Sequence, residues 1–256
     1  MDVLVCVKRV PATGAKIPLT EGGEDVDTRH LGFTIGPHEE CAVEEAVRIV
    51  ERFGGSSTVL TVGPPEADEQ LRYAISMGVD HGVLVETGSG ETDPEATASA
   101  IIAAIRELEA DGRRFDLIMF GNESADAGNY QVGIRVAYAL GLPIVGGVKG
   151  IELDLAAGQV AFRRPVDDGV EVYRAPLPSA VAVKEGLNLP RYPSIKGRLR
   201  AKKTQLRILR PELKDGGLRK VRLRLPPEAE RETVVLGHGA AAAGPVVDVL
   251  TELGVV

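Results

Sequence analysis

The sequence predicts an α/β fold built on a parallel sheet with helices on both faces. Two observations predict this class. Short apolar runs alternate with amphipathic stretches of helical period along residues 1–143, which is the pattern of consecutive βαβ units. The runs are apolar at successive positions, as expected for strands that are covered on both faces. Because the chain contains no Trp, its core is expected to consist mainly of Val, Leu, Ile and Ala.

The predicted strands of this region are rich in aliphatic residues and are bounded by residues that favour turns or helix starts. They are Val3–Val7, Thr58–Val62, Gly82–Glu86 and Phe115–Phe120. Proline marks the start of three predicted helices, since its fixed φ suits the first helical position. These helices begin at Pro37, Pro64 and Pro94. Asp93 is a suitable N-cap for the third, and a fourth helix is predicted over Tyr130–Leu140.

The chain changes character after Pro143. Short apolar runs separated by Ala-Ala-Gly and Asp-Asp-Gly predict hairpins, and a further buried strand is predicted at Ala180–Val183. The hairpin runs are Ile151–Leu155, Gln159–Arg164 and Val170–Tyr173. Residues 186–203 are interpreted as an irregular basic segment. Residues 211–244 are rich in Pro, Gly and charge, and a short helix is predicted over Val246–Leu253.

These patterns divide the chain into three predicted parts. Residues 1–185 are predicted to form a parallel-sheet α/β (Rossmann-like) domain with a hairpin-rich region. Residues 186–209 are predicted to be a basic recognition loop and strand. Residues 210–256 are predicted to be a C-terminal arm, and because the arm lacks a core of its own we expect it to pack on a partner subunit.

Composition excludes several classes of protein. A formal net charge of −7 argues against a chain built to coat nucleic acid. Two cysteines without a CxxC motif do not make a disulfide scaffold, and the apolar run at the N-terminus is too short for a signal peptide. No apolar stretch is long enough to span a membrane. We therefore expect a cytoplasmic protein.

The loop GNESADAGNYQVG is the strongest candidate for a ligand site. It follows the carboxyl end of a parallel strand, where ligands bind in open α/β sheets. It also leads into a helix N-terminus, where free N–H groups and the helix dipole favour a phosphate. Gly121 and Gly128 permit close approach of the backbone. Hydrogen-bonding side chains are offered by Asn122, Ser124, Asn129 and Gln131. The alternative is a plain polar connection.

Other candidate groups have a structural interpretation that is favoured over a functional one. His38, at the start of the first predicted helix, is placed to touch a ligand, but an exposed first-turn histidine is preferred. Cys6 and Cys41 are interpreted as buried, unreactive thiols. No GxSxG, HExxH or P-loop motif is present, and the four histidines lack metal-ligand spacing, so no catalytic residue and no metal site are predicted. A stand-alone adenine-nucleotide-binding sensor or hydrolase remains the alternative function.

The stretch PRYPSIKGRLRAKK predicts a docking surface, since it is basic and free of acids in an acidic chain. The cations between 191 and 207 are Arg191, Lys196, Arg198, Arg200, Lys202, Lys203 and Arg207. Tyr192 is the only aromatic there, so a nucleic acid would find no stacking platform. Ile195 lies between Pro193 and Gly197, and we interpret it as a partner anchor on a loop tip. A solvated loop, with Ile195 tucked onto its own domain, is the alternative.

Taken together, these segments resemble the electron transfer flavoprotein β subunit family over nearly the whole chain. The segments that carry the resemblance are VLVCVKRVP, GPHEECAVEEAVR, GPPEADEQLRYAISMGVD and NLPRYPSIKGRLRAKK, with GNESADAGNYQVG as a variant nucleotide loop. The resemblance implies a heterodimer with an α subunit that holds most of the redox FAD. It also implies electron transfer from dehydrogenases to a quinone oxidoreductase or another acceptor, in some relatives by electron bifurcation.

The resemblance further implies a nucleotide in this chain, either AMP or a second FAD in its place. The implied contacts are Cys6, Gly36, Pro37, His38, Glu39, Val62, Gly121, Asn122, Glu123, Ser124, Ala125, Asp126, Ala127, Gly128, Asn129, Tyr130, Gln131 and Val132. The implied docking residues are Arg191, Tyr192, Ile195, Lys202 and Lys203. Val132 departs from the Thr that is common in AMP-binding members, and His38-Glu39 replaces a pair that usually contains an aromatic residue. Both nucleotides therefore stay open.

Overall fold

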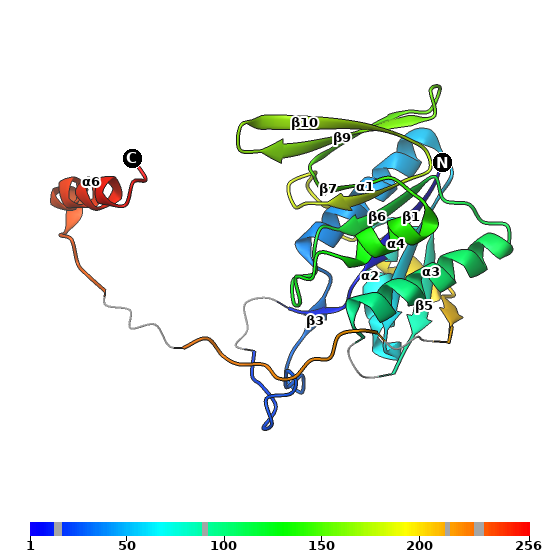
Figure 1. The fold of residues 1–256 in the computed structure, drawn as a ribbon, viewed down its shortest axis with the longest axis horizontal. Helices are drawn as coiled ribbons and strands as arrows, with labels where there is room; N and C mark the ends of the chain where they lie inside the picture. The colour runs from blue at the N-terminus through cyan, green and yellow to red at the C-terminus, as the bar shows by residue number, and fades with distance from the viewer. Residues whose placement is uncertain (13–16, 89–91, 213–215, 228–232) are drawn as a thin grey trace. The chain divides into compact units, whose positions relative to one another are not determined.

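A computed structural model of the chain describes residues 1–12, 17–88, 92–212, 216–227 and 233–256. Residues 1–221 and residues 222–256 form two separate compact units. Within the described residues of the first unit, a seven-stranded sheet has the strand order β12-β5-β4-β1-β6-β11-β7, and all neighbouring strands are parallel (Figure 1). Its strands are β1 (Asp2–Val7), β4 (Ser56–Gly63), β5 (His81–Glu86), β6 (Leu117–Gly121), β7 (Ile144–Val148), β11 (Ser179–Val183) and β12 (Arg207–Leu209). The predicted α/β class with a parallel sheet is confirmed.

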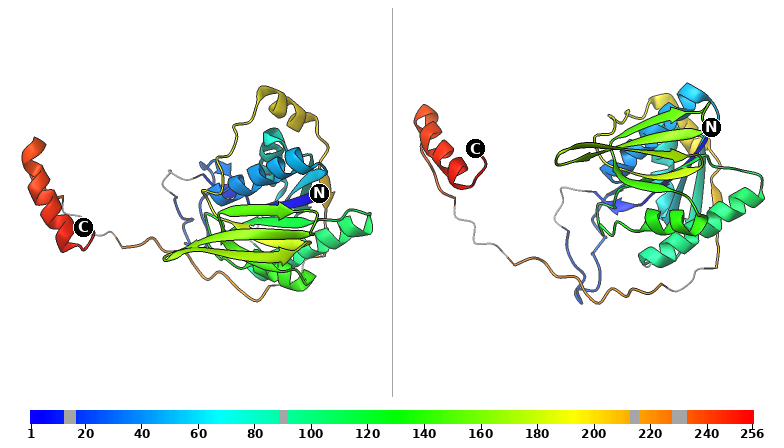
Figure 2. Two further views of the ribbon diagram at one scale, coloured as in Figure 1. Left: turned by 90° about the horizontal axis from the view of Figure 1, so that it is seen from above. Right: turned by 45° about the horizontal axis from the view of Figure 1, so that its top comes forward.

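Helices cover both faces of this sheet (Figures 1 and 2). Helices α1 (Pro37–Phe53) and α2 (Asp68–Met77) pack on one face with Val3 and Val5 of β1. Helices α3 (Pro94–Ala110) and α4 (Val132–Leu140) pack on the other face with Leu4 and Cys6. Successive residues of β1 thus enter two separate apolar cores. This arrangement explains why the strand is hydrophobic at every position from Val3 to Val7.

The helix boundaries follow the predicted signals in most places. Pro37 is the first residue of α1, and the Asp93 carboxylate accepts a hydrogen bond of 2.7 Å from Ala96 N at the start of α3. The helix predicted from Pro64 begins as a short 3₁₀ turn, η1 (Pro65–Ala67), and continues as α2. The predicted start of the fourth helix at Tyr130 is wrong. Tyr130 has a φ of 55°, which no α-helix accommodates, so α4 begins at Val132.

Residues 150–176 form a three-stranded antiparallel sheet, as the hairpin signals predict. Its strands are β8 (Gly150–Asp154), β9 (Gln159–Val166) and β10 (Gly169–Pro176), with Asp167 and Asp168 in the tight turn. Strand β7 was not predicted, because Gly146 and Gly147 interrupt its short apolar run. A small pair, β2 (Val10–Pro11) with β3 (Phe33–Thr34), precedes α1.

The prediction of an irregular segment over residues 186–203 is wrong in its second half. Residues 184–194, which we call the strap, contain no helix or strand, but α5 (Ile195–Lys203) follows directly. Ser194 caps this helix, since its hydroxyl accepts a hydrogen bond of 3.0 Å from Gly197 N. Ile195 is therefore the first residue of a helix, and not the tip of a loop.

Residues 222–256 carry the short 3₁₀ turn η2 (Gly239–Ala242) and helix α6 (Ala243–Glu252), where the sequence predicts a helix over Val246–Leu253. No described residue of this unit is buried. The arm predicted from residue 210 also includes residues 213–215 and 228–232, which lie outside the described residues. Across the described parts of both units, none of the helices has the length and apolarity needed to cross a membrane.

Candidate functional site

The strand order places a topological switch point beside β1. After β1 the chain forms β4 and then β5 on one side of β1 within the sheet. It then returns and forms β6 next to β1 on its other side. The connections that leave the carboxyl ends of β1 and β6 therefore separate, and such a separation opens a crevice where ligands bind in α/β sheets. The first turn of α1 and the loop from β6 to α4 meet at this point.

A pocket of about 410 Å³ lies at this edge, within the range of small-ligand sites, roughly 300–1,000 Å³. Its walls come from the start of α1, the loop after β6 and the residues after β11. The lining residues are Pro37, His38, Glu123, Ser124, Ala125, Asp126, Ala127, Gly128 and Glu185. The structure thus brings together, from segments far apart in sequence, a subset of the residues that the resemblance implies as nucleotide contacts.

His38 holds one wall of this pocket in place. Its Nδ1 accepts a hydrogen bond of 2.8 Å from Glu185 N, and its Nε2 lies 3.9 Å from the Glu123 carboxylate. The side chain is only 16% exposed, so the interpretation of an exposed first-turn histidine is wrong. The first turn of α1 packs close to the end of β11, and this packing covers the ring.

Glu39 is turned away from the pocket and into the protein. Its carboxylate accepts hydrogen bonds from Lys8 N at 2.8 Å and from Gly36 N at 2.6 Å, and so ties the end of β1 to the start of α1. Burial raises the pKa of Glu39 to about 7, against the lowering effect of these two N–H donors. Gly121 is required beside it, because a Cβ there would lie 2.7 Å from Glu39 Cγ.

The polar groups that line the pocket are mainly acidic. Glu123, Asp126 and Glu185 contribute carboxylates, and Lys8 Nζ pairs with Asp126 at 2.7 Å. Burial is the largest single effect and would raise the pKa of Asp126. The hydrogen bond and charge of Lys8, with hydrogen bonds from Ser124 and the Ala127 N–H, together outweigh it, so the pKa lies below its ordinary value. Ionised carboxylates accept hydrogen bonds from hydroxyl and amino groups and repel a phosphate. The pocket wall is thus suited to the sugar and base of a nucleotide.

Both ends of the loop lie outside the pocket lining, and the second end leads into α4. Asn122 Oδ1 accepts a hydrogen bond of 2.8 Å from Gly147 N and fixes the loop to β7. Asn129 is exposed, and the Tyr130 hydroxyl lies where a Cβ on residue 146 would sit. Gln131 is the N-cap of α4, and its side chain binds Arg135. The first turn of α4 carries no acidic residue, so its free N–H groups favour an anion.

Cys6, Gly36 and Val62 do not line the pocket. Cys6 packs in the core between the sheet and α3, where burial raises the pKa of its thiol. Cys41 is also buried, so both cysteines lie where inert thiols were predicted. Val62 packs against the same core as Cys6 from the carboxyl end of β4. Two lining or supporting residues were missed: Lys8 and Glu185. Both follow predicted strands closely. The expectation that ligands bind beyond the carboxyl ends of parallel strands, which pointed to Gly121, would have pointed to them as well.

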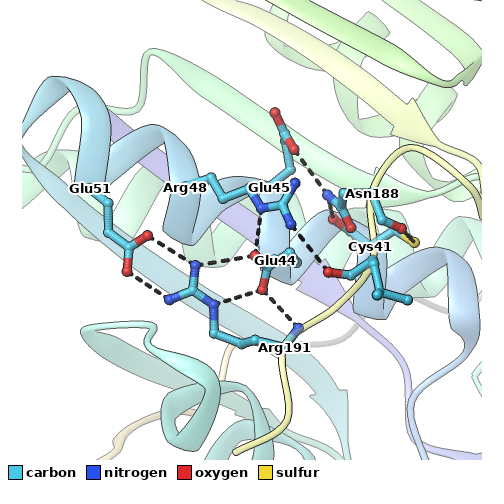
Figure 3. Close-up of polar contacts among 8 residues, drawn as sticks. Cys41, Glu44, Glu45, Arg48, Glu51, Asn188 and Arg191 are labelled. Carbon is cyan, nitrogen blue, oxygen red and sulfur yellow. Dashed lines mark hydrogen bonds and ion pairs between the residues drawn. The ribbon is translucent and has the colours of Figure 1, made fainter.

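The basic stretch divides into two groups. Tyr192 and Ile195 are 95% and 81% exposed, and Lys202 and Lys203 are exposed as well. Arg191 instead faces inward and binds the Glu44 and Glu51 carboxylates of α1 (Figure 3). Its guanidinium is thus engaged within the chain while its side chain stays 35% exposed, and its place in the docking surface stays a prediction.

The fold and this pocket define an α/β protein with a ligand site at the switch point of a parallel sheet. Comparison with known proteins places the chain within that class. A family model described as "Electron transfer flavoprotein domain" matches residues 25–212. The chain belongs to this family, which confirms the resemblance seen in the sequence.

Three relatives illustrate the similarity, and each is named "Electron transfer flavoprotein subunit beta". The protein of Bacillus subtilis is 32% identical over 259 residues, covering 98% of this chain and 97% of the relative. That of Mycobacterium tuberculosis (strain ATCC 25618 / H37Rv) is 35% identical over 214 residues, covering 81% and 78%. That of Syntrophomonas wolfei is 33% identical over 228 residues, covering 89% and 86%.

Proposed function

We propose that this chain is the β subunit of a heterodimeric electron transfer flavoprotein. In this role it accepts electrons from dehydrogenases, together with an α subunit, and passes them to a quinone oxidoreductase or another acceptor in the cytoplasm. The observation that carries the proposal is the pocket at the switch point, in a chain whose relatives bear the name of this subunit. The flavin supplies the redox chemistry when it is bound, and the side chains bind, orient and shield.

The pocket residues fit the adenosine part of a nucleotide. The carboxylates of Glu123 and Glu185 are suited to accept hydrogen bonds from ribose hydroxyls or the adenine amino group. The same charges disfavour a phosphate at that wall. A phosphate is better accommodated at the N-terminus of α4, where N–H groups are available and acids are absent. The helix dipole contributes only about 0.3 to 1 kcal/mol, so direct N–H donation must provide most of the binding.

The identity of the nucleotide is the finer part of this proposal. We favour AMP over a second FAD. AMP requires only the pocket wall that fits adenosine and one position for a phosphate. The redox FAD is assigned to the α subunit, since no strand of this chain is followed by a GxGxxG flavin fingerprint. Both assignments are tested by co-expressing the two subunits and identifying the released cofactors by mass. One FAD and one AMP per heterodimer is expected, whereas two flavins would reverse the preference.

Ile195 is the proposed anchor for partner dehydrogenases. It is 81% exposed at the start of α5, and the exposed cations Lys196 and Arg198 follow it along the helix. An exposed aliphatic side chain beside such charges is typical of an interface centre. Ile195→Ala should leave the melting temperature and flavin content unchanged and lower electron transfer from the cognate dehydrogenase by about tenfold, or about 1.4 kcal/mol. A lowered melting temperature with intact transfer would mean that the side chain stabilises the fold and does not dock.

A further inference from the structure

The strap, residues 184–194, runs along one side of α1 from the ligand pocket to the docking helix. Its contacts on α1 fall at intervals of three or four residues, which defines a single stripe of the helix. At the start, Glu185 N donates to His38. In the middle, Asn188 Nδ2 donates to Cys41 O at 3.0 Å and to the Glu45 carboxylate at 2.9 Å. The strap is thus attached to α1 by specific polar contacts along its length.

Arg191 makes the last and strongest of these attachments (Figure 3). Its guanidinium donates to Glu44 Oε2 at 2.8 Å and Oε1 at 3.1 Å, and to Glu51 at 2.7 and 2.9 Å. Its backbone N–H also donates to Glu44 Oε2 at 3.1 Å. Two carboxylates about two helical turns apart on α1 therefore bind one arginine. Paired, charge-assisted bonds of this kind fix both the position and the direction of a side chain.

The Glu44 carboxylate is suited to this role because it is rigid and ionised. Its side chain is only 2% exposed. Burial opposes its charge, but Arg191 and Arg48 bind it, and the pKa of Glu44 lies below its ordinary value. Arg48 also donates to Leu189 O at 3.2 Å, so the same cluster binds the backbone of the strap. An ion pair with one buried member is worth more than an exposed pair, since solvent screens it less.

Inward anchoring of Arg191 determines which strap residues face solvent. Asn188 and Arg191 point toward α1, whereas Leu189 and Tyr192 are 84% and 95% exposed. Ile195 follows four residues after Arg191. Leu189, Tyr192 and Ile195 therefore form an outward row that depends on the inward pair. A change in the rotation of the strap would turn Tyr192 toward α1 and move the start of α5.

We propose that Arg191 is a positioning residue for partner docking, acting through Glu44 and Glu51 to present Tyr192 and Ile195 in a fixed orientation. This inference rests on the proposed docking role of Ile195. It assigns to Arg191 no contact with the partner. Loss of these ion pairs should weaken encounter with the dehydrogenase and leave transfer within the complex intact, because Arg191 does not line the ligand pocket.

The test uses the complete flavin-containing heterodimer. In Arg191→Gln, Arg48 still pairs with Glu44 at 2.6 Å, so the buried carboxylate keeps a partner and the chain is expected to fold. Hydrogen exchange should accelerate by about tenfold at the amides of residues 185–192, apart from Pro190, which has no N–H. The dehydrogenase concentration giving half-maximal transfer should rise about fivefold, which corresponds to about 1 kcal/mol, with the maximal rate unchanged. Arg191→Lys should give an intermediate result, since lysine keeps the charge but lacks the planar guanidinium that makes paired hydrogen bonds.

Two further variants complete the test. Arg210→Gln is the matched control, because Arg210 also forms a paired bridge to a carboxylate, that of Glu86, but does not touch the strap. It should change neither strap exchange nor the half-saturating concentration. Glu51→Gln removes one of the two carboxylates that bind Arg191. Glu51 is 57% exposed, so this variant is expected to fold and to test the inference even if Arg191→Gln does not fold. It should shift both measurements in the same direction as Arg191→Gln, by a smaller factor.

The contrary outcomes are distinct. Unchanged exchange in residues 185–192 would show that Arg191 does not hold the strap and would overturn the inference. Faster exchange with an unchanged half-saturating concentration would also overturn it, since the packing of α5 alone would then suffice for docking. If Ile195→Ala leaves transfer intact, the docking role itself is wrong, whatever Arg191→Gln shows.

Discussion

Glu39 illustrates how one carboxyl group can organise a ligand site without lining it. It joins Lys8 at the end of β1 to Gly36 at the start of α1, and it packs against Gly121 at the end of β6. Those three segments surround the switch point. From the sequence alone, the resemblance implied that Glu39 contacts the nucleotide. Its inward orientation depends on two backbone donors that become visible only in three dimensions.

Glu39 should also make stability depend on pH. Its pKa rises from 4.5 to about 7 on folding, so the folded chain holds a proton that the unfolded chain has already released. Stability attributable to this group is therefore fully present below pH 4.5 and is lost as pH rises to about 7. The loss amounts to roughly 3 kcal/mol. Well above pH 7 the carboxyl group is ionised in both the folded and the unfolded chain, so it causes no further change in stability with pH.

Glu39→Gln should flatten that dependence, since an amide does not titrate. Its one carbonyl oxygen can accept from Lys8 N or Gly36 N but not well from both, so a cost of about 1–3 kcal/mol is expected at pH 5. The difference between variant and wild type should shrink toward pH 8. Urea unfolding at several pH values between 5 and 8 measures it. Parallel stability curves for the two proteins would contradict a titrating Glu39.

At the scale of elements, α2 and α5 bind each other through reciprocal arginines. Arg200 of α5 donates to Ile75 O at 2.7 Å and to Val79 O at 3.0 Å, at the carboxyl end of α2. Arg72 of α2 donates to Ala201 O of α5 at 2.6 Å. Each arginine binds carbonyls at or just beyond a helix end, where intrahelical donors run out. This arrangement explains how a nine-residue basic helix stays attached while burying only Ala201.

The contact between these helices is close enough to require glycine at position 197. A Cβ there would lie 2.2 Å from the backbone oxygen of Ser76. Gly197→Ala should therefore force α5 away from α2 and destabilise the chain by about 1–3 kcal/mol. Gly254→Ala, at a left-handed glycine in the other unit, provides a comparison that does not touch α5. Thermal unfolding of both variants measures the effect. An unchanged melting temperature for Gly197→Ala would show that the helices separate freely.

The elements show which parts of the fold were predictable. Strands β1, β4, β5, β6 and β11 were predicted because each is a local apolar run, and α1 and α3 because Pro and Asp mark their starts locally. Helix α5 was missed although Ser194 is a good N-cap, since its stability comes from α2, far away in sequence. The same limit applies to the site. The loop after β6 was found by position, but the inward turn of Arg191 depends on Glu44 and Glu51, which no local pattern connects with it.

For the whole molecule, the two units have very different capacities to fold. Residues 1–221 contain both apolar cores, whereas the described residues of 222–256 bury no side chain. Helix α6 presents aliphatic residues, including Val246 and Val247, which are 40% and 53% exposed. Apolar helices of this kind are stabilised by packing and not by propensity alone. We therefore expect this unit to contribute to association with the α subunit, as the sequence predicted for a C-terminal arm.

Truncation after Val221 tests whether residues 1–221 provide the stability of the chain and residues 222–256 contribute to association. The shortened chain should keep the melting temperature of the full chain within about 2 °C, because no described buried residue is removed. Its affinity for the α subunit should fall by tenfold or more, or about 1.4 kcal/mol, since the apolar face of α6 is lost from the interface. Co-purification and titration of the two subunits, read through flavin fluorescence, measure the affinity. Full affinity in the truncated chain would show that residues 1–221 carry the whole interface, and a large drop in melting temperature would show that residues 222–256 stabilise the first unit instead.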